Sequence, residues 1–219
     1  MESRYDTVAD WYAEFTRDWM PASLPYLPED LRGRHILDLA CGLGELSRLI
    51  ADRGATVTAV DASTEMLRHA VPTSGVDYRH GDATNTAWWD GAPFDGVVSN
   101  MALMDIDDLD AAVETITAVV SDRGWVLIAV LHPCFPGLPD TGTLPSWPPD
   151  QGYSREGWWT TDSDGVRGHV GAYHRMLSTY LNALVRAGLD IVEAIEPPAD
   201  IPRLLLLRCR RRPPNDPAR

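Results

Sequence analysis

The sequence predicts an α/β fold: one seven-stranded, mostly parallel sheet with helices on both faces and a C-terminal antiparallel hairpin. Short apolar runs alternate with amphipathic stretches of about 10 to 15 residues, which is the pattern of parallel strands joined by crossover helices. The run WVLIAVL is apolar at every position, as is typical of strands covered on both faces. The last two apolar runs are separated only by a proline-rich turn, so we expect them to pair antiparallel.

The elements of the first 133 residues follow from periodicity and from helix end signals. Aromatic and apolar residues at three- and four-residue steps predict a helix at the N-terminus, which the prolines that follow would end. Ser63 or Thr64 is expected to cap one helix at its start, and Gly54 and Gly124 to end two others. The predicted helices span residues 5–20, 44–54, 63–71 and 109–124, and the predicted strands span residues 35–40, 56–62, 76–83, 94–101 and 125–133.

Regular patterning stops over residues 134–172, which are rich in Gly, Pro, Trp and Asp. Irregular segments longer than about 15 residues in compact domains are usually lids or binding loops. Regularity resumes with a predicted helix over residues 173–189 and ends with strands over residues 190–196 and 203–209. We therefore expect a single domain, 1–219, with a helical cap over residues 1–30 and a lid or binding insertion over residues 134–172.

Composition excludes several classes of function. A net charge of −13 disfavours binding to nucleic acid and to anionic lipid. The three cysteines show no CxxC spacing, which argues against a disulfide framework or a zinc site. All 19 basic residues are arginine, so a lysine Schiff base and a P-loop lysine are excluded. With no apolar run of about 18 residues and no signal-peptide pattern, we expect a cytoplasmic protein that contacts no membrane.

The stretch ILDLACGLGEL places a carboxylate and two glycines where a buried strand should end. Gly42 and Gly44 permit a tight turn and the close approach of a ligand to the backbone. Asp38 would repel a pyrophosphate but suits a cation such as a sulfonium or an ammonium group. Asp61, at the end of the next strand, can accept both hydroxyls of a ribose. Ala40 and the lack of a third glycine depart from the dinucleotide fingerprint, which disfavours a nicotinamide oxidoreductase.

Four motifs, in order, resemble those of the class I S-adenosylmethionine-dependent methyltransferases, which have a Rossmann-like sheet: ILDLACGLGEL, VTAVDASTEML, RHGDA and FDGVVSNMALMDIDD. The resemblance covers the chain from about Val8 to Arg208. It implies S-adenosyl-L-methionine as cofactor, S-adenosyl-L-homocysteine as product and no metal. It also implies a set of cofactor-binding residues: Tyr12, Asp38, Ala40, Gly42, Gly44, Asp61, Ala62, Met66, Asp82, Ala83, Asn100 and Met101.

The resemblance also implies a role for each part of this set. The residues of the first motif would hold the methionine portion, and Asn100 and Met101 would line the same side. Asp61 would bind the ribose, and Tyr12 would close over the cofactor. Met66 would pack on the adenine, with Asp82 and the Ala83 N–H at its edge. Structural alternatives stay open for three of these residues: a turn cap for Asp82, a core position for Met66 and a helix N-cap for Asp61.

Proton removal from an acceptor would need a base, and histidine is the usual choice near neutral pH. Tyr173 or His174 is the first choice, because a helix N-terminus favours neutral histidine, and His132 at the end of the fifth predicted strand is the second. The alternatives are a His132 tied to backbone and a His174 facing water.

Aromatic residues are concentrated in the predicted cap and insertion, where a flat aromatic acceptor would explain them. The candidate acceptor-binding residues are Trp11, Phe15, Trp19, Phe135, Trp158 and Trp159. A small satellite core is the alternative. The acidic run DIDDLD, residues 105–110, is interpreted as a solvated helix start rather than a magnesium site.

The segments HPCF and YHRMLSTYLNAL are similar to methyltransferases of bacterial natural-product pathways. Some of those relatives methylate C3 of the indole in tryptophan-containing cyclodipeptides to give pyrroloindolines, which makes this secondary-metabolite reaction one hypothesis. The alternatives are O- or N-methylation of another small molecule and a non-catalytic regulator that binds S-adenosylmethionine. The expected partner is a small aromatic acceptor rather than nucleic acid or membrane, and a homodimer stays open.

Overall fold

The computed structural model describes residues 3–135 and 152–213 and confirms the predicted fold class. A seven-stranded sheet has the order β3-β2-β1-β4-β5-β9-β8, and a separate two-stranded sheet pairs β6 with β7. The large sheet contains β1 (His35–Leu39), β2 (Thr56–Asp61), β3 (Val76–His80), β4 (Phe94–Asn100), β5 (Val120–Leu131), β8 (Leu189–Ile195) and β9 (Leu204–Arg211). Strands β1 to β5 pair in parallel, and β9 pairs antiparallel with both β5 and β8.

The helices are shorter than the sequence pattern predicts at several ends. They are α1 (Ala9–Phe15), the 3₁₀ helix η1 (Leu24–Tyr26), α2 (Glu45–Ala51), α3 (Thr64–His69), α4 (Leu109–Val119), α5 (Val166–Val170) and α6 (Leu177–Arg186). None of the helices in the described ranges is long and apolar enough to cross a membrane.

Alternation along the strands divides the core between the two faces of the large sheet. Leu37 and Leu39 of β1 pack with α4 and α6 in one cluster, whereas Ile36 packs with α2 and the segment before β1 in the other. The same alternation occurs in β5, where Ile128 faces the first cluster and Leu127 the second. Both faces are therefore covered, which explains the unbroken apolar runs of these strands.

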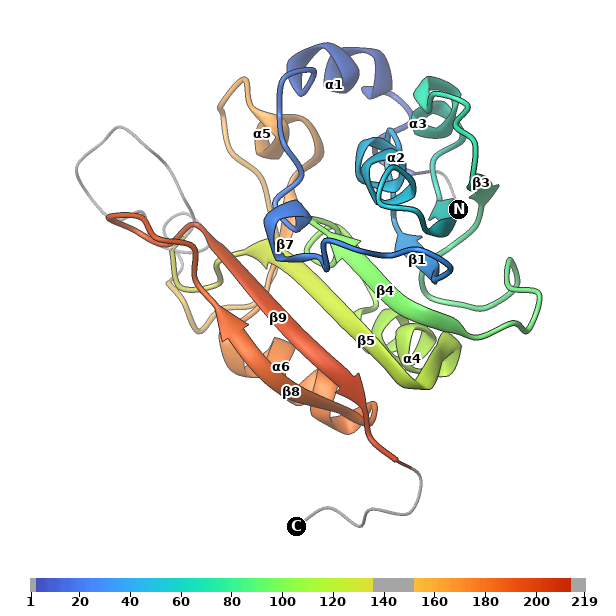
Figure 1. Cartoon of the computed structure of the whole chain (residues 1–219). Coiled ribbons are helices and arrows are strands. Elements are labelled where there is room, and N and C mark those ends of the chain that lie inside the picture. The colour runs from blue at the N-terminus through green and yellow to red at the C-terminus, as the bar shows by residue number, and fades with distance from the viewer. Residues whose placement is uncertain (1–2, 136–151, 214–219) are drawn as a thin grey trace.

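The strand order reverses between β1 and β4, and this is the point where open α/β sheets bind ligands beyond the carboxyl ends of their strands. In Figure 1, α1 and α5 lie near each other beyond that end of the sheet, together with the loops that follow the parallel strands. The small sheet of β6 (Gly157–Trp159) and β7 (Ala172–His174) lies at the same end. The elements from the cap and the insertion thus gather at one edge.

Three predicted elements differ from the structure. Helix α4 ends at Val119, and residues 120–124 begin β5 because Val120 pairs with Phe94, so Gly124 ends no helix. The helix predicted over residues 173–189 begins only at Leu177, because residues 172–174 form β7 against β6. The N-terminal helix covers Ala9–Phe15 rather than residues 5–20. In each case the local helical pattern is overridden. Two of the segments pair as strands with residues from elsewhere in the chain, and the ends of the predicted N-terminal helix form turns instead.

Candidate functional site

Asp38 is a buried carboxyl group near the carboxyl end of β1. It is 1% exposed and accepts a hydrogen bond of 2.6 Å from the Oγ of Ser47 on α2. Burial raises the pKa of Asp38 to about 7; the hydrogen bond from Ser47 opposes this rise, and the nearby charge of Asp61 adds to it. A carboxyl group with a pKa near neutrality loses its proton readily when a cation approaches.

Asp61 ends the neighbouring strand β2 and is joined to the glycine turn. Its Oδ2 accepts from the N–H of Gly42 at 2.7 Å, and its Oδ1 accepts from the N–H of Ser63 at 2.8 Å. Burial raises the pKa of Asp61, and these backbone hydrogen bonds oppose the rise. Ser63 also caps α3, because its Oγ accepts from the N–H of Met66. Asp61 is thus bound to the residues at the start of α3 and is not itself the N-cap.

The turn after β1 requires glycine at Gly44. Gly44 has φ +75°, and a Cβ there would lie 2.5 Å from Cε1 of Tyr78. Gly42 has φ +57°, and a Cβ there would lie 3.3 Å from the terminal methyl of Met66. Ala40 also adopts a positive φ of 59°, which is costly for a residue with a Cβ. Strain of this kind is concentrated at functional sites.

The tip of β4 has the same kind of backbone strain. Met101, directly after β4, has φ +58°, and its N–H donates to the carbonyl of Ala129 at 2.8 Å. The side-chain Oδ1 of Asn100 accepts from both the N–H and the Oγ of Ser23, at 2.9 and 2.7 Å. The segment after α1 therefore returns to the strand tips and fastens Asn100.

The residues assigned to the adenine side lie along α3 and after β3. Met66 is 3% exposed but belongs to neither core cluster of the described residues, which favours a position against the glycine turn. The Oδ1 of Asp82 caps the turn through the N–H and Oγ1 of Thr84, both at 2.8 Å. This cap was the structural alternative for Asp82. Ala83 packs in the main core cluster, and the carbonyl of Ala62 lies 3.1 Å from Nε2 of His80.

The two candidate histidines are buried and hydrogen-bonded. The Nδ1 of His132 accepts from the N–H of Cys134 at 3.1 Å, and its Nε2 lies 2.8 Å from Oε1 of Glu196. Both ring nitrogens of His132 are thus engaged, as the backbone-tied alternative expected. His174 is 2% exposed, and its Nε2 lies 2.6 Å from the carbonyl of Tyr153. Because His174 sits in β7, the expectation that a helix N-terminus tunes it is wrong.

The aromatic residues of the cap form a ladder. Trp11 stacks on Phe15 with ring centroids 4.8 Å apart, and on His169 of α5 at 3.9 Å. Trp19 continues this ladder at 5.3 Å from Phe15, and both of these rings are largely exposed. Tyr12, on the same helix, meets the ring of Tyr5 edge-on at 5.4 Å, and burial raises its pKa.

The aromatic residues of the insertion separate into two environments. Trp158 of β6 packs edge-on against Tyr173 of β7 at 5.3 Å and is 44% exposed. Trp159 points the other way and is buried in the main core cluster, so its ring serves the core. The ring centroids of Phe135 and His132 lie 5.0 Å apart. Residues 136–151 of the predicted insertion lie outside the described residues.

Sequence reasoning missed a buried ion pair beside the strand tips. Asp105, read as part of a solvated helix start, pairs with Arg167 of α5, and only 12% and 16% of their side chains are exposed. The other carboxylate oxygen of Asp105 accepts from the Tyr5 hydroxyl at 2.9 Å. The apolar residues MALM directly before Asp105 were the signal that this first acid of the run is covered.

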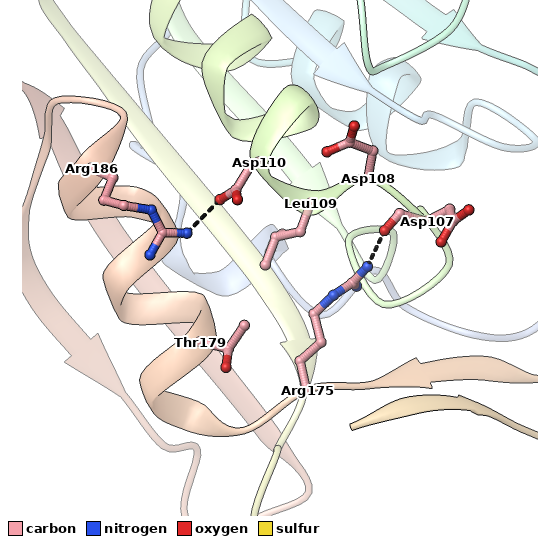
Figure 2. Close-up of a pocket in the computed structure, with 7 residues that line it drawn as sticks. All are labelled: Asp107, Asp108, Leu109, Asp110, Arg175, Thr179 and Arg186. Atoms are coloured by element: carbon pink, nitrogen blue, oxygen red, sulfur yellow. Dashed lines mark hydrogen bonds and ion pairs between the residues drawn. The ribbon is translucent and has the colours of Figure 1, made fainter. Parts of the chain in front are cut away.

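The rest of the acidic run agrees with the predicted helix start. Asp108 caps α4 by accepting from the N–H of Ala111. An open cavity of about 410 Å³ lies beside this helix start. Among the residues that line it, Arg186 pairs with Asp110, and Arg175 reaches the carbonyl of Asp107 (Figure 2). None of the residues at the tips of β1, β2 and β4 lines this cavity, so it is separate from the candidate site. Within the described residues no group of three or more His, Cys, Asp or Glu could hold a metal ion.

Comparison with known proteins connects this geometry to a family. Residues 37–128 match the family model described as a methyltransferase domain. The chain is 29% identical to an S-adenosylmethionine-dependent methyltransferase structure from Mesorhizobium loti, with a TM-score of 0.70, covering 93% of this chain and 98% of the other. A second such structure, from Listeria monocytogenes, is 25% identical with a TM-score of 0.70 and covers 94% and 100% of the two chains.

Curated relatives match over shorter lengths. A ubiquinone biosynthesis O-methyltransferase from Paracidovorax citrulli is 32% identical over 108 residues, which is 47% of this chain and 45% of the relative. A trans-aconitate 2-methyltransferase from Streptomyces avermitilis is 39% identical over 110 residues, 46% of this chain and 39% of the relative. The chain thus spans less than half the length of either relative. The matched domain, the whole-chain structural matches and the two carboxyl groups beside a glycine turn all support a methyltransferase domain of the class I S-adenosylmethionine-dependent kind.

Proposed function

We propose that the protein transfers the methyl group of S-adenosylmethionine to a small aromatic acceptor. The observation that carries this proposal is the pair of carboxyl groups, Asp38 and Asp61, at adjacent strand tips, with the Gly42 N–H of the glycine turn donating to Asp61. Two acids at one strand edge suit a ligand that bears an ammonium group and a ribose. The curated relatives named as methyltransferases of ubiquinone biosynthesis and of trans-aconitate support a small-molecule acceptor.

The cofactor supplies a methyl group on a positively charged sulfur, and the transfer is an in-line displacement. The residues of this chain align the two reactants and exclude water, which is where proteins contribute most to such a reaction. Asp38 would hold the ammonium of the methionine portion, and Asp61 would accept from the ribose hydroxyls. The strained backbone at Ala40 and Met101 lies at the tips on either side of the expected sulfonium position.

The edge-on pair of Trp158 and Tyr173 supports an aromatic acceptor, because it offers ring surface beside the strand tips. Tyr173 is fixed there because its N–H donates to the carbonyl of Met104 at 2.7 Å. Within this proposal, residues 1–30 act as a cap and residues 134–172 as the acceptor-binding insertion of a single domain.

The finer hypothesis is methylation at C3 of an indole in a tryptophan-containing cyclodipeptide. This reaction needs a base for the indole N–H. Tyr173 or His174 of β7 is the first candidate for this base, and His132 is the second. O- or N-methylation of another aromatic acceptor is the alternative, and it needs no base when the nucleophile is already deprotonated.

Calorimetry with S-adenosylhomocysteine and with NADH tests the cofactor assignment, and we expect micromolar binding of the first and none of the second. A methyl-labelled cofactor incubated with indoles, phenols, amines and carboxylic acids, and read by mass increase, then tests the acceptor class. Labelling of a carboxylic acid alone would refute the aromatic acceptor, and the absence of any labelling with intact cofactor binding would favour a regulator. Light scattering tests the homodimer.

A further inference from the structure

Three consecutive side chains near the N-terminus fasten to three separate parts of the molecule. Arg4 reaches the small sheet of β6 and β7 and also donates to the carbonyl of Asp105. Tyr5 reaches the side chain of the same Asp105, in the loop after β4, and Asp6 reaches the start of α3. Residues 3–8 therefore cross from the tip of β2 to the far side of the tip of β4. Strand β1 lies between β2 and β4, so this segment, here called the strap, crosses the end of β1 that bears Asp38.

The first two strap contacts are made on the acceptor side. The Arg4 guanidinium lies 4.2 Å from the ring centroid of Trp158 and 5.5 Å from that of Tyr173. The Tyr5 hydroxyl donates to Asp105 at 2.9 Å. Asp105 is a fixed anchor, because Arg167 of α5 holds it from the other side and itself donates to the carbonyl of Gly171.

The third contact is made on the cofactor side. The Oδ1 of Asp6 accepts from the Oγ of Ser63 at 2.6 Å, and its Oδ2 accepts from the N–H of Ser3 at 2.9 Å. The N–H of Ser63 donates to Asp61, the proposed ribose ligand. Asp6 of the strap therefore binds Ser63, and Ser63 in turn binds the carboxylate that would hold the cofactor.

The strap is held by polar contacts rather than by a core. Within the described residues 3–22, Ala9 is the one apolar side chain that is buried. Firm anchoring begins at Ser23, which is 0% exposed and bound to Asn100, and continues with the buried Leu27 and Leu31. Segments with little buried apolar area open at low cost while the rest of the protein stays folded.

We propose that residues 3–15 form a gate that lifts as a unit about residues 16–23 to let the cofactor enter and leave, and that Tyr5 and Asp6 are its latches. This inference rests on the proposed function, because it assumes that the ligand binds at Asp38 and Asp61. A gate sets the rates of exchange in both directions. Weakening a latch therefore raises the association and dissociation rates together, whereas removing a ligand contact raises the dissociation rate alone.

Surface plasmon resonance with S-adenosylhomocysteine on the full chain measures both rates. We expect Tyr5→Phe and Asp6→Ala each to raise both rates by roughly 3- to 10-fold, the size expected for the loss of one hydrogen bond between the strap and the rest of the protein, with less than a twofold change in Kd. Glu14→Gln is the matched control, because Glu14 lies on α1 and its ion pair among the described residues is with the nearby Arg17 rather than with a distant element. This control should leave both rates unchanged.

Trypsin gives an independent readout, because the chain contains arginine but no lysine and Arg4 and Arg17 lie within or next to the gate. We expect S-adenosylhomocysteine to slow cleavage at these two sites and the latch variants to speed it. Wild-type protein that does not bind the ligand would refute the proposed function itself. The gate would be refuted, while the cofactor assignment would stand, by any of three results obtained with a protein that binds the ligand. These are unchanged rates in both latch variants, a rise in the dissociation rate alone, and trypsin cleavage that the ligand does not slow.

Discussion

The affinity for S-adenosylhomocysteine should fall as the pH drops through neutrality, because Asp38 must be charged to hold an ammonium group. Burial raises the pKa of Asp38 from 3.8 to about 7, so near pH 6 most of the unliganded protein has Asp38 protonated. Binding then requires the loss of this proton. With one linked proton and a bound-state pKa well below 6, Kd should be roughly eightfold higher at pH 6 than at pH 7.5.

The raised pKa of Asp38 predicts weaker binding at low pH without a loss of folded-state stability at this residue. An unfolded chain loses the Asp38 proton near the ordinary value of 3.8, whereas the folded protein keeps it up to about pH 7. The folded state therefore binds more protons between these values. The contribution of Asp38 to the free energy of unfolding is full below the unfolded pKa and is lost as the pH rises through 7. Lowering the pH to 6 thus favours the folded state at this residue.

Isothermal titration calorimetry at pH 6, 6.5, 7 and 7.5 measures the dependence, and the matched variant is Asp38→Asn. Asparagine keeps an oxygen that can accept from Ser47, so the fold should be retained while the titrating group is lost. We expect this variant to bind more weakly at pH 7.5 and to show no dependence on pH. A constant wild-type Kd across this range, or an equal slope in the variant, would refute the role given to Asp38.

Three further substitutions test the site. Asp61→Ala should weaken binding of S-adenosylhomocysteine by about 1–3 kcal/mol, since a half-buried charged acceptor is lost, as measured by calorimetry. Gly44→Ala should lower the free energy of unfolding by at least about 1–3 kcal/mol in urea, because its positive φ and the ring of Tyr78 both oppose a Cβ. Asp105→Asn should lower it by about 3 kcal/mol, because it leaves the buried Arg167 without its carboxylate.

Each stability measurement has a surface counterpart on the same chain. Asp110→Asn removes an ion pair with Arg186 whose two side chains are each 59% exposed, so the free energy of unfolding should change by less than about 1 kcal/mol. Gly91→Ala places a Cβ at φ +93° with no atom within 4 Å, and thus isolates backbone strain from the clash with Tyr78. Equal losses for Gly44→Ala and Gly91→Ala would contradict a steric role for Tyr78.

Local patterns predicted most of the fold because strands buried on both faces leave an unbroken apolar signature. The strands of the first half and the edge hairpin of β8 and β9 lie where these runs predict them. The misplaced boundaries have a common cause. Residues 120–124 and 172–174 become strands only because Phe94 and residues 157–159 are there to pair with them. Helical periodicity in one segment contains no information about such partners.

The same division holds within the candidate site. The two acids and the glycine turn could be read from the chain, because the carboxyl ends of neighbouring parallel strands must meet at one edge. The hydrogen bonds from Ser47 to Asp38 and from the Gly42 N–H to Asp61 could not, since nothing in the chain marks what these groups will face. The burial of Asp105 likewise depends on distant segments, and so does the difference between the exposed Trp158 and the buried Trp159.

The amino-acid sequence by itself determined the α/β class, the strand tips that carry Asp38 and Asp61, and the resemblance to class I S-adenosylmethionine-dependent methyltransferases, because these depend on short-range pattern and spacing. Tertiary structure alone decided that three neighbouring side chains of the strap reach three distant elements, and that His174 lies in a strand rather than at a helix start. Contacts between residues far apart in the sequence, such as Arg4 with Trp158 and Tyr5 with Asp105, set these features, and their energies appear only once the sheet has brought the segments together.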